Sequence, residues 1–97
     1  MSGIKLGVQV ADAAKLLPKQ GKTAIKGALL GEIKPDSLAA KSGMREGDII
    51  IALQGHSIHG VEDLAKELQR VAIAHLQEPT VTIWREGREE LLYLEVN

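Results

Sequence analysis

One short, strongly apolar segment, Ile49–Leu53, constrains the fold of this chain most. It reads Ile-Ile-Ile-Ala-Leu, which is too short for a helix and too rich in β-branched residues to be anything but a buried strand. Turns bound it on both sides, at Gly47-Asp48 and at Gln54-Gly55. The second turn is tight, so Ser57-Ile58 can resume pairing with the segment from the other side.

After Gly60 the apolar period changes from that of a strand to that of a helix. Glu62 and Asp63 fall in the first turn, where the helix dipole favours anions, and Gly60 is an acceptable cap. The residues that recur at helical spacing form one apolar stripe: Val61, Leu64, Ala65, Leu68, Val71 and Ala72. These features predict one long helix, from Val61 to about Ala74.

Two shorter elements are predicted near the start of the chain. Ile4–Val10 alternates apolar and polar residues, which indicates a short strand entered through a loop at Leu6-Gly7. Asp12 is expected to cap a single helical turn, Ala13–Leu17, which Pro18 and Gly21 end.

The segment Ile25–Ile33 resembles a strand that Gly27 and Gly31 interrupt, which suggests strand edges or a close backbone approach. Ser37 then stands where the N-cap of a helix of about one and a half turns should be. Gly43 follows at the position of a left-handed C-cap.

A final hairpin is predicted from Thr80–Arg85 and Glu90–Val96. A two-residue loop would set Ile83 opposite Glu90 and place a carboxylate on the apolar face, so we predict a four-residue loop, 86–89. That register pairs Ile83 with Leu92 and Val81 with Leu94. The other face then carries Thr82, Trp84, Leu91 and Tyr93, which are too apolar to be bare and should be covered by a loop or a partner.

The size and charge of the chain exclude several classes of protein. Its 97 residues suit one small domain, predicted over residues 4–96, with residues 1–3 interpreted as a start or a cloning remnant. With 12 basic and 13 acidic side chains, no patch for nucleic acid is expected. No apolar stretch approaches the ~20 residues of a membrane span, and the absence of cysteine excludes a disulfide scaffold. The class is α+β with a small, mostly antiparallel sheet.

Side chains that could carry chemistry gather between residues 48 and 59. Asp48, His56 and Ser57 suggest a hydrolytic triad, but no nucleophile motif such as G-x-S-x-G is present. His56 and His59 could hold a metal ion on one helix face, but they fall in a turn with no third ligand nearby. We therefore predict no catalytic residue, no metal site and no cofactor.

Backbone chemistry remains as a candidate for function. The loop Leu6-Gly7-Val8 leads into a strand and can direct successive N–H groups into one concavity, which attracts an anion. If Val8–Val10 lies at a sheet edge, its free backbone groups can pair with an added strand, and the long helix could form the opposite wall. From the residues alone the alternative stays open that this loop is an ordinary turn and that Val61 and Ala65 are ordinary core residues.

Residues 31–55 carry a specific set of motifs: Pro-x-Ser-x-Ala-Ala-x-x-Gly from Pro35, then Gly-Asp-Ile-Ile from Gly47, then the turn at Gly55. In order and spacing they resemble the PDZ domains of bacterial HtrA/Deg-family serine proteases, and the resemblance extends roughly from Ile4 to Val96. It implies a small, partly open β-sandwich or barrel of five to six mostly antiparallel strands. One long helix and one or two short helices complete this circularly permuted bacterial arrangement.

The resemblance also implies a peptide groove between strand 8–10 and helix 61–74. The amides of Leu6, Gly7 and Val8 would hold the terminal carboxylate of a peptide, and Leu6, Val8 and Val61 would form the pocket for its last side chain. The rest of the groove would be lined by Lys5, Gln9, Val10, Ala65 and Leu68. An aromatic residue often found just before the loop glycine is absent here, which leaves the terminal pocket aliphatic.

Two functions of different class follow from this resemblance. The first is a non-catalytic module that captures apolar C-termini or extended segments by strand addition. It would be the recognition or regulatory domain of a larger protease in the bacterial periplasm or cell envelope, and its partners would be peptide or protein C-termini and the other domains of that protein. The alternative is a structural or assembly domain whose groove is occupied by its own chain or by a neighbouring domain.

Overall fold

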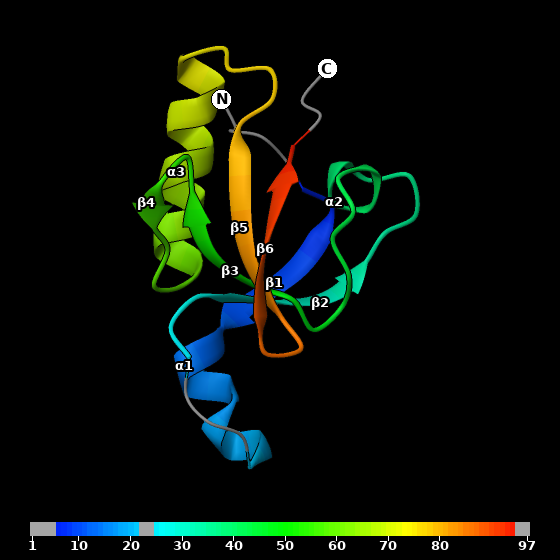
Figure 1. Cartoon of the computed structure of the whole chain (residues 1–97), viewed down its shortest axis with the longest axis vertical. Helices are drawn as coiled ribbons and strands as arrows, with labels where there is room; N and C mark the ends of the chain where they lie inside the picture. Colours follow the sequence, from blue (N-terminus) through cyan, green and yellow to red (C-terminus); the bar gives the residue numbers. More distant parts are fainter. Residues whose placement is uncertain (1–5, 22–24, 95–97) are drawn as a thin grey trace.

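The computed structural model describes residues 6–21 and 25–94. The elements follow in the order β1 (Val8–Asp12), α1 (Ala13–Leu16), the 3₁₀ turn η1 (Pro18–Gln20), β2 (Ala28–Ile33), α2 (Leu38–Lys41), β3 (Ile49–Leu53), β4 (His56–Ser57), α3 (Val61–Ile73), β5 (Thr80–Arg85) and β6 (Arg88–Tyr93) (Figure 1). The predicted buried strand and the predicted long helix are both confirmed. The first strand begins later than predicted, at Val8, and residues 4 and 5 lie outside the described residues.

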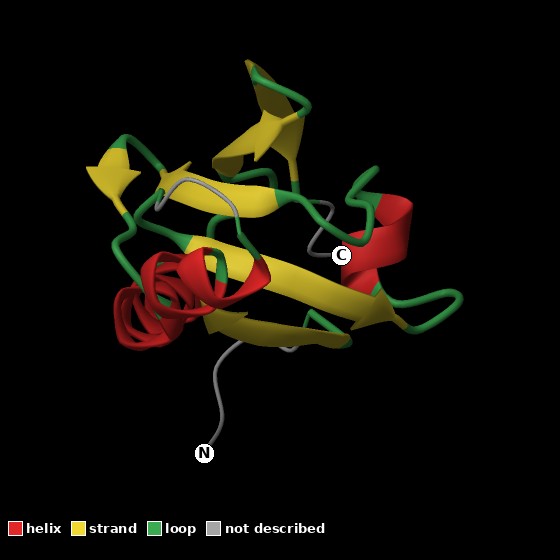
Figure 2. Ribbon diagram, turned by 90° about the horizontal axis from the view of Figure 1, so that it is seen from below, coloured by secondary structure: helices red, strands yellow, loops and turns green. Residues whose placement is uncertain are grey.

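The strands form one antiparallel sheet in the order β1-β2-β3-β5-β6, with β4 paired to β3. The α+β class and the mostly antiparallel sheet are confirmed. Figure 2 shows that the strands curl around the interior and do not form a flat layer. Since β1 and β6 lie at the two ends of the order, each leaves one edge without a strand partner among the described residues.

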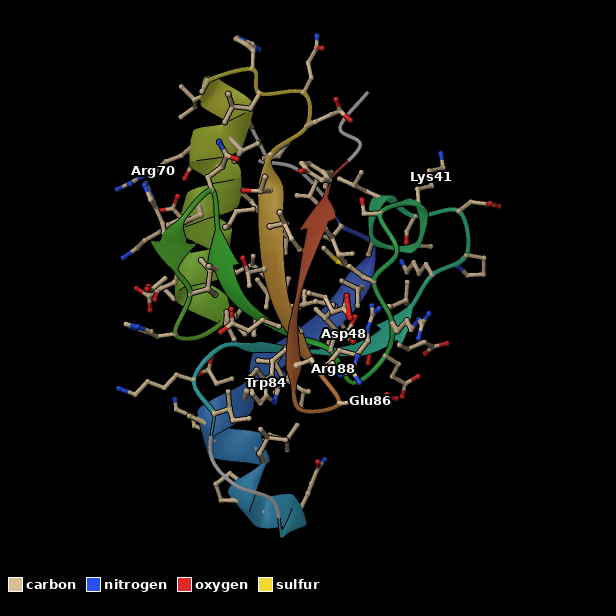
Figure 3. All side chains as sticks on the ribbon, viewed as in Figure 1. Lys41, Asp48, Arg70, Trp84, Glu86 and Arg88 are labelled. Atoms are coloured by element: carbon tan, nitrogen blue, oxygen red, sulfur yellow. The ribbon has the colours of Figure 1, made fainter. Side chains whose placement is uncertain are left out.

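Aliphatic side chains fill the core on the concave side of this sheet. Ile50, Leu53 and Ile83 are fully buried there, and α3 contributes Leu64 and Val71 at 3% and 2% exposure. These two positions of the long helix therefore face the core. On the outer face a smaller cluster joins Ala13, Leu17 and Ile49 beneath α1, with Trp84 packed against it (Figure 3).

Ser37 caps the start of the short helix α2, and Gly43 follows its end, as predicted. The Ser37 Oγ accepts a hydrogen bond from the Ala40 N–H at 3.1 Å, and Gly43 follows the helix with a φ of 89°. At Gly27 the predicted close backbone approach is also present, because a Cβ there would lie 2.6 Å from the Ile50 carbonyl oxygen.

The predicted register of the last hairpin is wrong. β5 and β6 are joined by a two-residue turn, Glu86-Gly87, and Ile83 pairs with Glu90 while Val81 pairs with Leu92. Both turn residues have positive φ, 51° and 80°, and such turns match the right-handed twist of a hairpin. Glu90 thus lies opposite Ile83, but its carboxylate is not buried. Its side chain is exposed on an end strand, within the electrostatic reach of Arg85.

The faces of the hairpin follow the prediction although its register does not, because a shift of two residues preserves side-chain direction. Trp84 is covered by the cluster beneath α1, as expected for this apolar face. Leu91 and Tyr93 remain 56% and 53% exposed.

Candidate functional site

A hollow of about 150 Å³ lies between β1 and α3. Successive side chains of a strand alternate in direction, so Val8 and Val10 share the face of β1 that meets the helix. Val61, Ala65 and Leu68 stand at i, i+4 and i+7 and present one stripe from the other side. The full lining is Leu6, Val8, Val10, Val61, Leu64, Ala65 and Leu68. The structure thus brings together predicted residues that are about fifty positions apart in the sequence.

Of the predicted site residues, one lies outside the described part of the chain and another lies away from this hollow. Lys5 lies outside the described residues. Gln9 is exposed and points to the other side of β1 from Val8 and Val10, where it joins Glu32 and Lys34 around a second, wider hollow of about 550 Å³ beside the loop. Gln9 therefore does not line the hollow between β1 and α3.

Two hydrogen bonds set the orientation of the loop before β1. The Leu6 carbonyl accepts from the Ala39 N–H at 2.9 Å, and the Gly7 carbonyl accepts from the Lys34 N–H at 2.9 Å. In a trans peptide the N–H points opposite to the C=O, so the N–H groups of Gly7 and Val8 are directed away from α2 and from β2. Successive N–H groups turned in this way form a concavity suited to an anion.

Glycine is required at position 7 for two reasons. Its φ is 76°, a backbone conformation that side chains disfavour, and an added Cβ would overlap the Cβ of Ser37. The N-terminal end of α2 therefore supports this loop directly. Any larger residue at position 7 would displace the loop from α2.

β1 offers one open backbone edge to the hollow. Within the described residues this strand pairs only with β2, through register contacts that run from Val8 with Ile33 to Asp12 with Ala28. An extended segment can therefore be added on the other side of β1, between the strand and α3.

The far end of the hollow is bounded by an interaction that the sequence did not predict. Asp12 stands at the N-cap position of α1, as predicted, but its side chain accepts no hydrogen bond from that helix; its Oδ1 accepts a hydrogen bond of 2.7 Å from the backbone N–H of Val61, 49 residues away. Lys15 Nζ lies 3.4 Å from Asp12 Oδ2. The hydrogen bond from Val61, assisted by Lys15, holds the pKa of Asp12 below its usual value of 3.8.

This bond defines which ends of β1 and α3 meet. Val61 lies beside the end of β1, and because the two elements run in opposite directions (Figure 1), Leu68 lies toward the loop at Leu6. The sequence held one sign of this contact. Gly60 has no side chain to cap α3, so a capping group must come from elsewhere in the chain.

The side chains considered for catalysis and metal binding are engaged elsewhere. Asp48 is 2% exposed and forms a bidentate pair with Arg85, His56 Nδ1 lies 3.1 Å from Glu67 Oε2, and His59 Nδ1 lies 3.8 Å from Asp63 Oδ2. In the described part of the chain no three acidic, histidine or cysteine side chains gather as a metal ion would require. No described helix is long and apolar enough to cross a membrane.

Comparison with known proteins identifies the family of this chain. A family model described as PDZ domain matches residues 31–85, more than half of the chain. The chain belongs to the PDZ domain family, as the motifs between Pro35 and Gly55 indicated.

Curated relatives of the chain are proteases. It is 33% identical over 92 residues to a probable periplasmic serine endoprotease DegP-like of Rhizobium meliloti, covering 94% of this chain and 18% of that protein. It is 35% identical over 86 residues to the protein of the same description from Bartonella henselae, covering 88% of this chain and 16% of that protein. The chain thus spans less than a fifth of the length of these relatives.

Two solved structures share the fold. The HtrA-type protease AlgW with decapeptide superposes with a TM-score of 0.79 at 23% identity, covering 98% of this chain and 29% of that one. The HtrA3 PDZ domain bound to the phage-derived ligand FGRWV superposes with a TM-score of 0.72 at 19% identity, covering 94% of this chain and 82% of that one. At this level of identity the likeness is one of fold.

Proposed function

We propose that this chain is a non-catalytic peptide-binding module that captures apolar C-termini or extended segments. The observation that carries the proposal is the juxtaposition of an open strand edge, an apolar hollow and the outward-directed N–H groups of Gly7 and Val8. The edge supplies backbone hydrogen bonds, the hollow accepts side chains, and the N–H groups hold a carboxylate.

The bound segment runs antiparallel to β1 and ends at the loop. Its last side chain enters the hollow near Leu6, Val8 and Leu68, and Ala65 leaves room beside it. Side chains alternate along a strand, so the third residue from the end shares this face and lies near Val10 and Val61. This revises our expectation that Val61 belongs to the terminal pocket, because its hydrogen bond to Asp12 puts it at the other end of β1.

We further propose that the module serves a larger serine protease of the bacterial periplasm or cell envelope, as its recognition or regulatory domain. Its relatives are described as periplasmic serine endoproteases, and it matches less than a fifth of their length. Two related folds are described with bound peptide or ligand. The other domains of that protease would be further partners.

Calorimetry with the peptide acetyl-Ala-Ala-Val-Ala-Val tests this function. The free acid should bind with an affinity on the order of micromolar, since a few residues must be ordered on binding. The C-terminal amide of the same peptide should bind several-fold more weakly, because it lacks the anion. Equal affinities would refute the carboxylate site and favour internal segments, and no binding of either peptide would refute the proposed function.

A further inference from the structure

The hydrogen bond between Asp12 and Val61 joins the two walls of the hollow. Asp12 ends β1 and Val61 begins α3, and among the described residues no other hydrogen bond connects these two elements. The Asp12 side chain is 33% exposed, so the contact lies at the rim, where an extended ligand would leave the hollow.

Gly60 makes room for this contact. It is the N-cap residue of α3 and has extended backbone angles, φ 178° and ψ −171°. A Cβ at this position would lie 2.6 Å from Asp12 Oδ1. The carboxylate from β1 therefore occupies the space in which a helix normally places its own capping side chain.

We infer that Asp12 is a positioning residue that fixes the spacing between β1 and α3, and thereby the affinity of the groove for peptide; this inference rests on the proposed function. An added strand must fit between the edge of β1 and the side chains of α3. At the loop end, this spacing is set by the packing of Leu6 and Leu68, both buried in the core. At the other end it is set by a 2.7 Å bond from a short, stiff side chain.

A simpler role must be separated from this one, since Asp12 could act as a helix cap alone. A cap stabilises α3 wherever it comes from, whereas a positioning residue must come from β1. Asp12→Ala removes both functions. Adding Gly60→Ser to Asp12→Ala returns a local cap, because extended backbone accepts serine and Asp12 Oδ1 no longer blocks its Cβ.

The experiment measures melting temperature and the affinity for acetyl-Ala-Ala-Val-Ala-Val with a free carboxylate. Asp12→Ala should lower both, the affinity by on the order of fivefold. The double variant should regain melting temperature but not affinity. If it regains affinity as well, Asp12 is only a cap and the inference is overturned.

Two further variants serve as controls. Asp12→Asn keeps an acceptor oxygen at the same position and should keep most of the affinity, which also covers the case in which Asp12→Ala fails to fold. Asp63→Ala removes another carboxylate at this helix end, one that accepts a hydrogen bond of 2.9 Å from the His59 N–H and does not reach β1. It should leave the affinity unchanged; a loss equal to that of Asp12→Ala would contradict the inference.

A structural measurement distinguishes failure of the inference from failure of the proposed function. If the unmodified protein binds no peptide, the proposed function fails. Nuclear Overhauser distances between side chains of β1 and α3 still decide the spacing of the two elements in the absence of peptide. A changed spacing in both Asp12→Ala and the double variant supports the inference, and an unchanged spacing contradicts it.

Discussion

Arg85 donates two hydrogen bonds to the carboxylate of Asp48, from Nε to Oδ1 at 2.8 Å and from Nη2 to Oδ2 at 2.6 Å. Nη2 also donates to the Gly43 carbonyl at 2.8 Å, and the Arg45 N–H donates to Asp48 Oδ2 at 2.9 Å. The hydrogen bonds to Asp48 raise the pKa of Arg85 above its ordinary value. They fasten the hairpin of β5 and β6 to the turn that leads into β3.

Replacing Arg85 by alanine should therefore destabilise the domain severely. The buried Asp48 carboxylate would lose the charge that offsets its burial, which should lower the unfolding free energy by about 3 kcal/mol. Urea denaturation measures it, with the exposed Arg88→Ala on the same hairpin as the control. A change below about 1 kcal/mol, the range of surface pairs, would show that this ion pair is not the main link.

The two faces of α3 should respond in opposite ways to substitution. Ala65 is exposed and lines the hollow, so Ala65→Trp should block peptide binding and leave the fold intact. Leu64 is buried, so Leu64→Ala should cost roughly 2–5 kcal/mol by opening a cavity. Titration calorimetry and urea denaturation measure the two effects. Unfolding by Ala65→Trp with little effect of Leu64→Ala would contradict the orientation of the helix.

The terminal pocket should prefer small aliphatic residues. Its walls come from Leu6, Val8, Ala65 and Leu68, and the chain contains no phenylalanine. Peptides that end in Val, Ile or Ala should bind best, and a terminal Phe should lose about 1 kcal/mol or more, the scale of ordinary overpacking. A peptide series that differs only in its last residue measures this, and a clear preference for Phe would show that the pocket is wider than described.

The contribution of Asp12 to stability should depend on pH. Its folded-state pKa is lowered, so its ionised form favours the folded state; this stability is present above the unfolded pKa near 3.8 and is lost as the pH falls through the lower folded value. The difference in melting temperature between the unmodified protein and Asp12→Asn should therefore persist at neutral pH and shrink in acid. A difference that does not change between pH 7 and pH 2 would contradict the ionised contact with Val61.

Local patterns were sufficient to predict most of the fold. The β-branched segment at Ile49, the stripe from Val61 and the cap at Ser37 each act within a few residues, and each element formed where predicted. The register of the hairpin was harder to predict from the sequence, because a shift of two residues keeps every side chain on its face. The two registers differed only in whether the Glu90 carboxylate lies opposite Ile83 on the apolar face. Because Glu90 is exposed on an end strand, that placement carries little energetic penalty.

The sequence pointed to most residues that line the hollow, but not to the direction in which α3 runs along β1. The stripe of α3 and the loop at Gly7 are visible in the sequence, and their meeting at one hollow follows from the family resemblance. The direction of α3 along β1 depends on the bond between Asp12 and Val61, which are 49 residues apart. No local pattern encodes such a contact, and the local rule assigned Asp12 to the wrong helix.

Amide chemical shifts during titration with acetyl-Ala-Ala-Val-Ala-Val test peptide capture at the Gly7 loop most directly. The account predicts that the free acid shifts the N–H resonances of Gly7 and Val8 strongly, because both exchange water for an anion, and that the amidated peptide shifts them much less. Residues of β1 and α3 that line the hollow should shift with both peptides. Shifts that spare Gly7 and Val8 while affecting another part of the surface would contradict the account.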